Sequence, residues 1–290
     1  MRRLRRGIAT LAVGGALLLV PDSQAASTLF SLVEVEESTG VDFGDDDVVV
    51  VLALGSDSEG NADAIELIAL NFETGQAAAV GIPRDTVVEF DGEPSKINDG
   101  LPRGGAQLMA DAVADLTDVR PQFVLTTGSA GFRALVDSVG ELRVTSDFTI
   151  DDEKYGLHVT PGINPMNGLQ ATGFAGTREV PGNDFGRMAN QQHLLEAILD
   201  KIRAQEDTEG FIESGALAAL EHLDTGLSPS ELYRFAQAIS QVDPAQTTTC
   251  VLTGPSVPLG VNVGIELAPG YPERVAADAV DGHLDGGCNP

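Results

Sequence analysis

The sequence predicts an α/β protein, a three-layer α/β/α sandwich around a central mixed sheet, in one domain with a disulfide-linked C-terminal extension. Two observations support this fold class. Residues 48–54 form an unbroken apolar run rich in valine, which is typical of a strand buried on both faces. Predicted strands and amphipathic helices then follow one another along the chain, an order that favours helices packed on both faces of a sheet.

The remaining elements follow from apolar periodicity and turn residues. Further strands are predicted where short apolar segments lie between turn signals: 64–72, 77–83, 122–127, 141–146 and 247–253. Helices are predicted where apolar side chains recur every three or four residues: 105–117, 129–139 and 188–202. The capping box of Ser228 and Glu231 predicts a helix that extends to Ile239, and a last short helix precedes the C-terminus.

The composition limits the classes of partner. The formal net charge is −27, from 17 basic and 44 acidic residues, which argues against nucleic acids and anionic membrane surfaces. This acidity also fits a protein kept soluble in high salt. It leaves room for a local cationic pocket.

Residues 1–26 have the pattern of an export signal. Arginines precede an apolar run from Gly7 to Val20, and small residues follow it. The run is shorter than the roughly 20 residues of a membrane helix, so a cleaved signal peptide is favoured over a signal anchor. Residues 27–46 are predicted to be a linker, 47–250 the main domain and 251–290 the C-terminal extension.

Cys250 and Cys288 are the two cysteines of the chain. In the oxidising compartment that an export signal implies, they predict a disulfide that joins the C-terminal tail to the domain. Free thiols are the alternative. Neither cysteine has the spacing of a metal or redox motif.

Two aspartates lie at the ends of the loop after the first strand. Asp57 lies in the turn that follows that strand and Asp63 precedes the next strand, so their carboxylates can meet at the mouth of one loop. Such a pair suits Mg²⁺, which takes one or two protein carboxylates and completes its coordination with water and phosphate oxygens. Alternatively, both are turn residues that bond their own backbone.

Basic and polar residues in later predicted loops are candidates for a phosphate site, where arginine offers a planar fork and lysine a point charge. They are Arg84, Asp85, Lys96, Asn98 and Arg178. Arg187 and Gln191 share one face at the start of the predicted helix, where backbone N–H groups attract anions. The alternative for each basic residue is a surface ion pair, and Gln192 and His193 are interpreted as surface residues.

These segments form an ordered set of motifs. In chain order they are Gly55-Ser56-Asp57-Ser58, Asp63 before a strand, Ile82-Pro83-Arg84-Asp85-Thr86, Lys96-Ile97-Asn98 with Gly104-Gly105, Arg178, and Asp184-Phe185-Gly186-Arg187 with Gln191-Gln192. The set resembles the LytR-CpsA-Psr (LCP) family of bacterial cell-envelope proteins, over residues 48 to about 203.

The resemblance implies an extracytoplasmic phosphotransferase, in which residues 47–250 are the catalytic domain. Its substrates would be a glycopolymer on a polyprenyl pyrophosphate carrier and an acceptor in peptidoglycan or another envelope glycan, with membrane association through the lipid or an N-terminal anchor. By position, Asp57 and Asp63 would hold Mg²⁺. The residues implied in catalysis are Arg84, Asp85, Arg178 and Arg187, and those implied in substrate binding are Arg84, Lys96, Asn98, Arg178, Arg187 and Gln191.

The lipid tail requires an apolar slot, which we expect between the sheet and the helices at 105–117 and 188–202. The chain also departs from the family pattern, because Asn61, Gly176 and Asn190 stand where the family has arginine. A non-catalytic envelope protein that binds polyprenyl phosphate, a glycan or a protein partner is therefore the alternative. The enzyme hypothesis requires the remaining arginines to converge beside the two aspartates.

Other chemistries find no support in the sequence. The four histidines lack zinc-site spacing, and no Gly-x-Ser-x-Gly nucleophile elbow or Gly-rich nucleotide loop is present.

Overall fold

The structure is a computed structural model that describes residues 48–205 and 239–290. The predicted export signal, the linker and the predicted helix from Ser228 to residue 238 lie outside the described residues. Within the described part of the chain, no helix is both long and apolar enough to cross a membrane.

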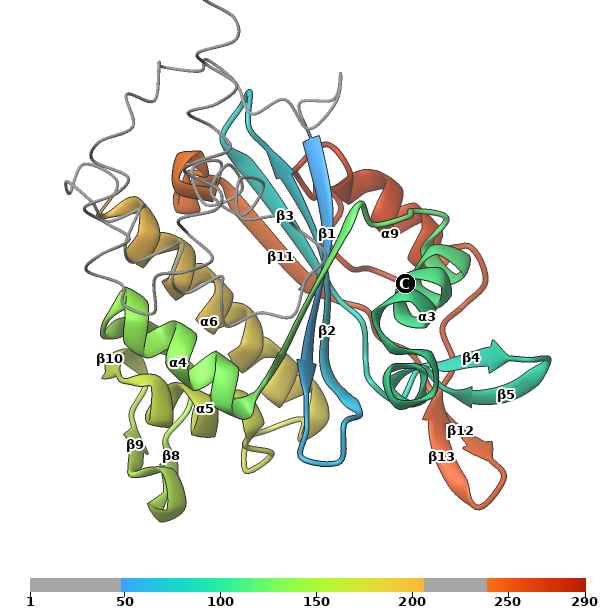
Figure 1. Ribbon diagram of the computed structural model, residues 1–290, viewed down its shortest axis with the longest axis horizontal. Coiled ribbons are helices and arrows are strands. Elements are labelled where there is room, and N and C mark those ends of the chain that lie inside the picture. The colour runs from blue at the N-terminus through green and yellow to red at the C-terminus, as the bar shows by residue number, and fades with distance from the viewer. Residues whose placement is uncertain (1–47, 206–238) are drawn as a thin grey trace, which may run out of the picture.

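A five-stranded mixed sheet forms the centre of the molecule, with the strand order β11-β3-β2-β1-β6 (Figure 1). β1 (Val48–Ser56) pairs with β2 (Ala62–Asn71) in antiparallel and with β6 (Phe123–Gly128) in parallel orientation. β3 (Gln76–Gly81) is antiparallel to β2 and parallel to β11 (Thr247–Val251). The predicted mixed sheet is confirmed.

Helices cover both faces of this sheet, so the three-layer prediction is also confirmed (Figure 1). One face carries α3 (Gly100–Thr117) and α9 (Tyr271–Ala279). The other carries α4 (Ser129–Val139), α5 (Gly168–Gly176) and α6 (Asp184–Arg203).

Helix α3 begins before the predicted start at residue 105. Gly105 has a φ of 67° and kinks the helix, so the regular apolar spacing begins only after it. The prediction therefore found the part of the helix beyond the kink.

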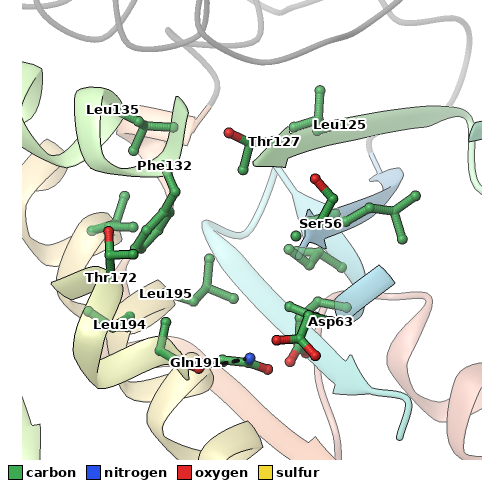
Figure 2. A pocket seen from close by; sticks show the side chains of 18 of the residues that line it. Ser56, Asp63, Leu125, Thr127, Phe132, Leu135, Thr172, Gln191, Leu194 and Leu195 are labelled. Carbon is green, nitrogen blue, oxygen red and sulfur yellow. Dashed lines mark hydrogen bonds between the residues drawn. The ribbon is translucent and has the colours of Figure 1, made fainter. Parts of the chain in front are cut away.

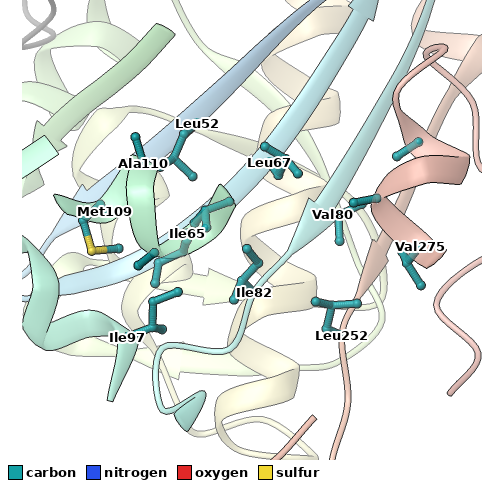
Figure 3. Close-up of a cluster of buried hydrophobic side chains, with 14 of the residues drawn as sticks. Leu52, Ile65, Leu67, Val80, Ile82, Ile97, Met109, Ala110, Leu252 and Val275 are labelled. Carbon is teal, nitrogen blue, oxygen red and sulfur yellow. The ribbon is translucent and has the colours of Figure 1, made fainter. Parts of the chain in front are cut away.

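The alternation of side chains along β2 assigns its residues to the two layers. Ile65 and Leu67 pack with Met109 of α3 and Val275 of α9 in one buried cluster (Figure 3). Ile68 and Leu70 belong to the cluster on the opposite face, beside α6. Consequently Glu66, between Leu67 and Ile65, faces the α4, α5 and α6 layer.

Shorter elements surround the sheet. Three hairpins pair β4 (Val87–Phe90) with β5 (Glu93–Lys96), β8 (Ile150–Asp152) with β9 (Leu157–Val159), and β12 (Ser256–Leu259) with β13 (Asn262–Ile265). β7 (Leu142–Ser146) pairs in antiparallel orientation with β10 (Gly162–Met166), and the β8–β9 hairpin lies between them in the chain. The 3-10 helices within the described residues are η1 (Ile97–Asp99), η2 (Glu153–Tyr155) and η4 (Pro244–Gln246). The strand predicted at 141–146 is present, but it lies outside the central sheet.

The predicted disulfide between Cys250 and Cys288 is formed, with a Cα–Cα distance of 5.4 Å. Next to it, the buried Tyr271 hydroxyl donates a hydrogen bond to the Cys288 carbonyl at 3.0 Å and accepts one from the Thr253 backbone N–H at 3.3 Å. The extension after β11 is therefore held against the edge of the sheet.

Candidate functional site

The carboxylate of Asp63 is the centre of a charged cluster. Its Oδ1 atom contacts the guanidinium of Arg84, lies 2.6 Å from Arg187 Nη1 and lies 3.7 Å from Arg178 Nη2. Arg84 Nη1 also lies 3.7 Å from Asp57 Oδ2. The structure thus brings together the five charged side chains on which the enzyme hypothesis depends.

Sheet topology explains this convergence. Asp57 directly follows β1, and Asp63 is the second residue of β2, its antiparallel neighbour. Arg84 follows β3, the next strand in the sheet. Arg178 follows α5, and Arg187 lies in the first turn of α6, whose N-terminus favours anions. Loops that are far apart in the sequence therefore meet at one end of the strands of the sheet.

Asp57 has two roles, because each of its oxygens has different partners. Its Oδ1 accepts hydrogen bonds from the backbone N–H groups of Glu59 and Asn61, both at 2.9 Å. Its Oδ2 faces Arg84 and the Asn61 side-chain amide, the latter at 3.3 Å. Asp57 is both a turn residue and a member of the cluster.

Arg187 and Arg178 contact the same two carboxylates but differ in exposure. The Arg187 side chain is 0% exposed, and its Nη2 lies 2.9 Å from Asp184 Oδ1. The Arg178 side chain is 53% exposed, and its Nε donates to the same Asp184 oxygen at 3.2 Å. Arg187 is therefore fixed inside the protein, whereas Arg178 is accessible to a ligand.

The cluster keeps Asp63 ionised. Burial acts to raise the pKa of Asp63, but the hydrogen bond and charge of Arg187, together with those of Arg84, outweigh it and lower the pKa from the ordinary 3.8. At neutral pH the site therefore contains a carboxylate surrounded by guanidinium groups.

The loop of Arg84 is held from behind. Asp85 pairs with Lys96 Nζ at 3.0 Å, and the backbone N–H of Asn98 donates to the Arg84 carbonyl at 3.2 Å. The Asn98 side chain is 3% exposed. In this structure Asn98 and Lys96 therefore support the Arg84 loop.

An apolar slot opens beside the cluster (Figure 2). Its volume is about 310 Å³, and strands β1, β2 and β6 form one wall while α4, α5 and α6 form the other. Asp63 and Gln191 lie at one end, and Phe132, Leu135 and Leu195 line the interior. Gln191 donates its side-chain amide to the Ala175 carbonyl at 3.1 Å.

The position of this slot corrects part of the prediction. Helix 188–202 borders the slot as predicted, but helix 105–117 does not, because Met109 and Val113 of α3 pack against the opposite face of the sheet. Along β2 the lining runs from Asp63 to Leu70, which corresponds to about 24 Å at the rise of an antiparallel strand.

The sequence interpretation missed two polar residues of this region. Glu66 lines the slot and is 7% exposed, and Gln192 is 6% exposed, so the assignment of Gln192 to the surface was wrong. Burial raises the pKa of Glu66 to about 8, against the opposing effect of the Gln192 amide. In the sequence, the feature that could have identified Glu66 is its position as a glutamate among the apolar residues of a predicted strand.

Asn61, Gly176 and Asn190, which stand where the family has arginine, have different surroundings. The Asn61 amide contacts Asp57, and the buried Asn190 amide donates to the Phe174 carbonyl at 3.2 Å. Gly176 lines the slot, and a Cβ added there meets no atom within 4 Å. Gly176 therefore has open space for a longer side chain.

The donor set fits a hard divalent cation that shares its coordination with a substrate. Among the described residues, no group of three or more histidines, cysteines and acids could hold a metal ion by itself. Asp57 and Asp63 offer two carboxylates beside one arginine, and Mg²⁺ commonly uses one or two carboxylates together with substrate phosphates.

Comparison with known proteins identifies relatives of this chain. The chain is 30% identical, over 190 residues, to the polyisoprenyl-teichoic acid–peptidoglycan teichoic acid transferase TagU of Bacillus licheniformis, and the match covers 61% of each chain.

Solved structures show the same fold. TagV of B. subtilis superposes with a TM-score of 0.69 at 22% identity, covering 82% of this chain and 99% of that one. TagT bound to LIIa-WTA superposes with a TM-score of 0.66 at 22% identity, covering 81% and 90%. The sequence model of the LytR_cpsA_psr family matches residues 21–265. The chain therefore belongs to the LytR_cpsA_psr family.

Proposed function

We propose that this protein transfers a glycopolymer from a polyprenyl pyrophosphate carrier to peptidoglycan or another cell-envelope acceptor. The observation that carries the proposal is the junction of the charged cluster and the slot, because Asp63 belongs to both. A pyrophosphate joined to a long apolar chain has the same two parts in the same order. The activity in the name of the Bacillus relative supports the same assignment.

The side chains of the cluster have distinct parts in this reaction. Arg178 is exposed and would meet the pyrophosphate first, while the buried Arg187 and the supported Arg84 would hold its oxygens in a fixed position. Phosphoryl transfer depends mainly on positioning and on stabilising charge on the phosphate oxygens. Arginine forks suit both tasks.

The bond changes are simple. An acceptor hydroxyl oxygen forms a bond to the phosphorus that carries the glycopolymer, and the bond from that phosphorus to the bridging oxygen breaks. Polyprenyl phosphate leaves, and the hydroxyl proton is released. The guanidinium groups stabilise the charge that moves onto the leaving phosphate.

Mg²⁺ belongs to the same proposal. Asp57 and Asp63 would hold it, and it would supply positive charge to the phosphate oxygens. Arg84 contacts both carboxylates, so the guanidinium and the cation would share these ligands.

An extracytoplasmic location in the cell envelope, reached through the export signal of residues 1–26, completes the proposal. Contact with the membrane would come through the lipid carrier or an N-terminal anchor.

The test is phosphate release from a short-chain polyprenyl pyrophosphate by purified residues 27–290, with Mg²⁺ or with a chelator. Asp63→Ala and Arg187→Ala remove members of the cluster. Arg120→Ala is the matched control, because Arg120 pairs with Asp111 on the surface of the α3 layer, on the other face of the sheet. Metal-dependent release that is lost in the first two variants and kept in the control supports the proposal.

The three positions without arginine favour a second candidate, a non-catalytic protein of the same fold that binds polyprenyl phosphate, a glycan or a protein partner. Each charge-assisted hydrogen bond contributes about 1.5 to 3 kcal/mol, so two missing contacts could reduce the rate by orders of magnitude. Lipid binding by calorimetry without any phosphate release would favour this candidate.

A further inference from the structure

Glu66 is a carboxyl in the wall of an apolar slot. It lies three residues beyond Asp63 on β2, which places it about 10 Å along the strand from the charged end. The other residues of β2 that line the slot beyond Ala64 are Ile68 and Leu70. A chain that enters past Asp63 must therefore pass a single acid before it reaches aliphatic surface on this strand.

The carboxyl has little polar contact in the structure. Both of its oxygens are buried without a hydrogen-bond partner among the described residues. The Gln192 amide lies beside it, but that amide donates to the Cys250 carbonyl at 2.6 Å. Gly81, opposite Glu66 on β3, leaves room for both side chains, because a Cβ there would lie 3.2 Å from each of them.

Among the described residues, no cation lies next to Glu66 to balance a charge on it. Its partners in the sheet are Ala53 on β1 and Gly81 on β3, and neither strand contains a titratable residue. From α6, Met188 and Gln192 face this position. The other titratable residues of β2, and those of α6 before Asp200, lie elsewhere. Asp63, Asp184 and Arg187 belong to the charged cluster. His193 does not line the slot, and Glu196 bonds to Thr249.

We propose that Glu66 is a specificity-determining residue of the slot, which accepts an isoprenoid chain only while the Glu66 carboxyl is neutral. This inference rests on the proposed function, since it concerns the lipid part of the substrate. An ionised carboxylate would need water, and an apolar chain in the slot displaces water. The same charge would also repel the pyrophosphate held at the end of the slot.

The size of the effect follows from linkage. Burial raises the pKa of Glu66 to about 8, so the neutral fraction falls from about nine-tenths at pH 7 to about one-tenth at pH 9. When a single form binds, the apparent dissociation constant rises as the fraction of that form falls. The affinity for an isoprenoid phosphate should therefore decrease about tenfold between these pH values.

Calorimetry with farnesyl phosphate at pH 7, 8 and 9 tests the inference in the wild type and in Glu66→Gln. Glutamine has nearly the same shape and does not titrate, so the variant also corrects for ionisation of the phosphate and of other groups. Glu66→Met is a second variant, in case the amide disturbs folding, and melting temperatures verify that each protein is folded. Inorganic pyrophosphate, measured in parallel, reports on the charged cluster without the slot.

We expect the dissociation constant of the wild type to rise about tenfold from pH 7 to pH 9 relative to Glu66→Gln and Glu66→Met. Equal pH profiles in wild type and variants, with farnesyl phosphate bound, would overturn the role of Glu66 and leave the proposed function intact. Binding of pyrophosphate without binding of farnesyl phosphate at any pH would overturn both the role of Glu66 and the assignment of the slot to the lipid.

Discussion

Replacement of Arg187 by methionine should destabilise the protein much more than the same replacement of Arg178. Both arginines contact Asp63 and Asp184, so the two variants remove contacts with the same carboxylates. Arg187 is 0% exposed and Arg178 is 53% exposed. The pair of variants therefore separates burial from the identity of the partners.

The expected magnitudes follow from this difference. Removing one partner of a buried ion pair typically costs about 3 to 5 kcal/mol, because the remaining charge is left buried. Arg84 and Arg178 still contact Asp63 after the change, so we expect about 3 kcal/mol for Arg187→Met. For Arg178→Met we expect less than about 1 kcal/mol, since water screens an exposed pair.

Urea unfolding at pH 7, followed by circular dichroism, measures both values. Binding of inorganic pyrophosphate, measured by calorimetry on the folded variants, should weaken in both cases because each change removes a guanidinium from the cluster. Equal losses of stability in the two variants would refute the reasoning, because they would mean that burial of Arg187 has no energetic consequence.

Three further predictions concern other parts of the molecule. Gly176→Arg should strengthen pyrophosphate binding about tenfold, because one charge-assisted hydrogen bond contributes about 1.5 kcal/mol or more. Calorimetry measures this affinity, and the Gly176→Gln variant separates the effect of charge from that of side-chain size. Equal affinities in the arginine and glutamine variants would contradict the prediction. Because the pKa of Glu66 is raised from 4.5 to about 8, the folded state holds a proton that the unfolded state releases, so the stability from this group is complete below pH 4.5 and is lost as the pH rises to about 8. The loss is on the order of 4 kcal/mol, and urea unfolding across this range should show it in the wild type but not in Glu66→Gln. Replacing Cys250 and Cys288 together by serine should cost about 3 to 4 kcal/mol in thermal unfolding, as expected for a bridge across 38 residues, and an unchanged melting temperature would show that the bridge does not restrict the unfolded chain.

Local sequence was sufficient for the fold class. The apolar run at residues 48–54 had to be a buried strand, and the helix periods at 129–139 and 188–202 had to pack on a sheet, so the mixed three-layer domain followed. The disulfide followed from the presence of two cysteines in a chain with a predicted export signal. Motif order was also sufficient to nominate the charged residues that the structure brings together around Asp63.

The tertiary structure alone decided which residues share a layer. Periodicity shows that the helix at 105–117 has an apolar face, but not which side of the sheet that face covers, so the slot was placed partly against the wrong helix. Sequence likewise could not separate the buried Arg187 from the exposed Arg178, or place Gln192 beside Glu66. Burial and pairing of these side chains depend on strands and helices that are distant in the chain, whereas a sequence pattern reports only on the segment that contains it.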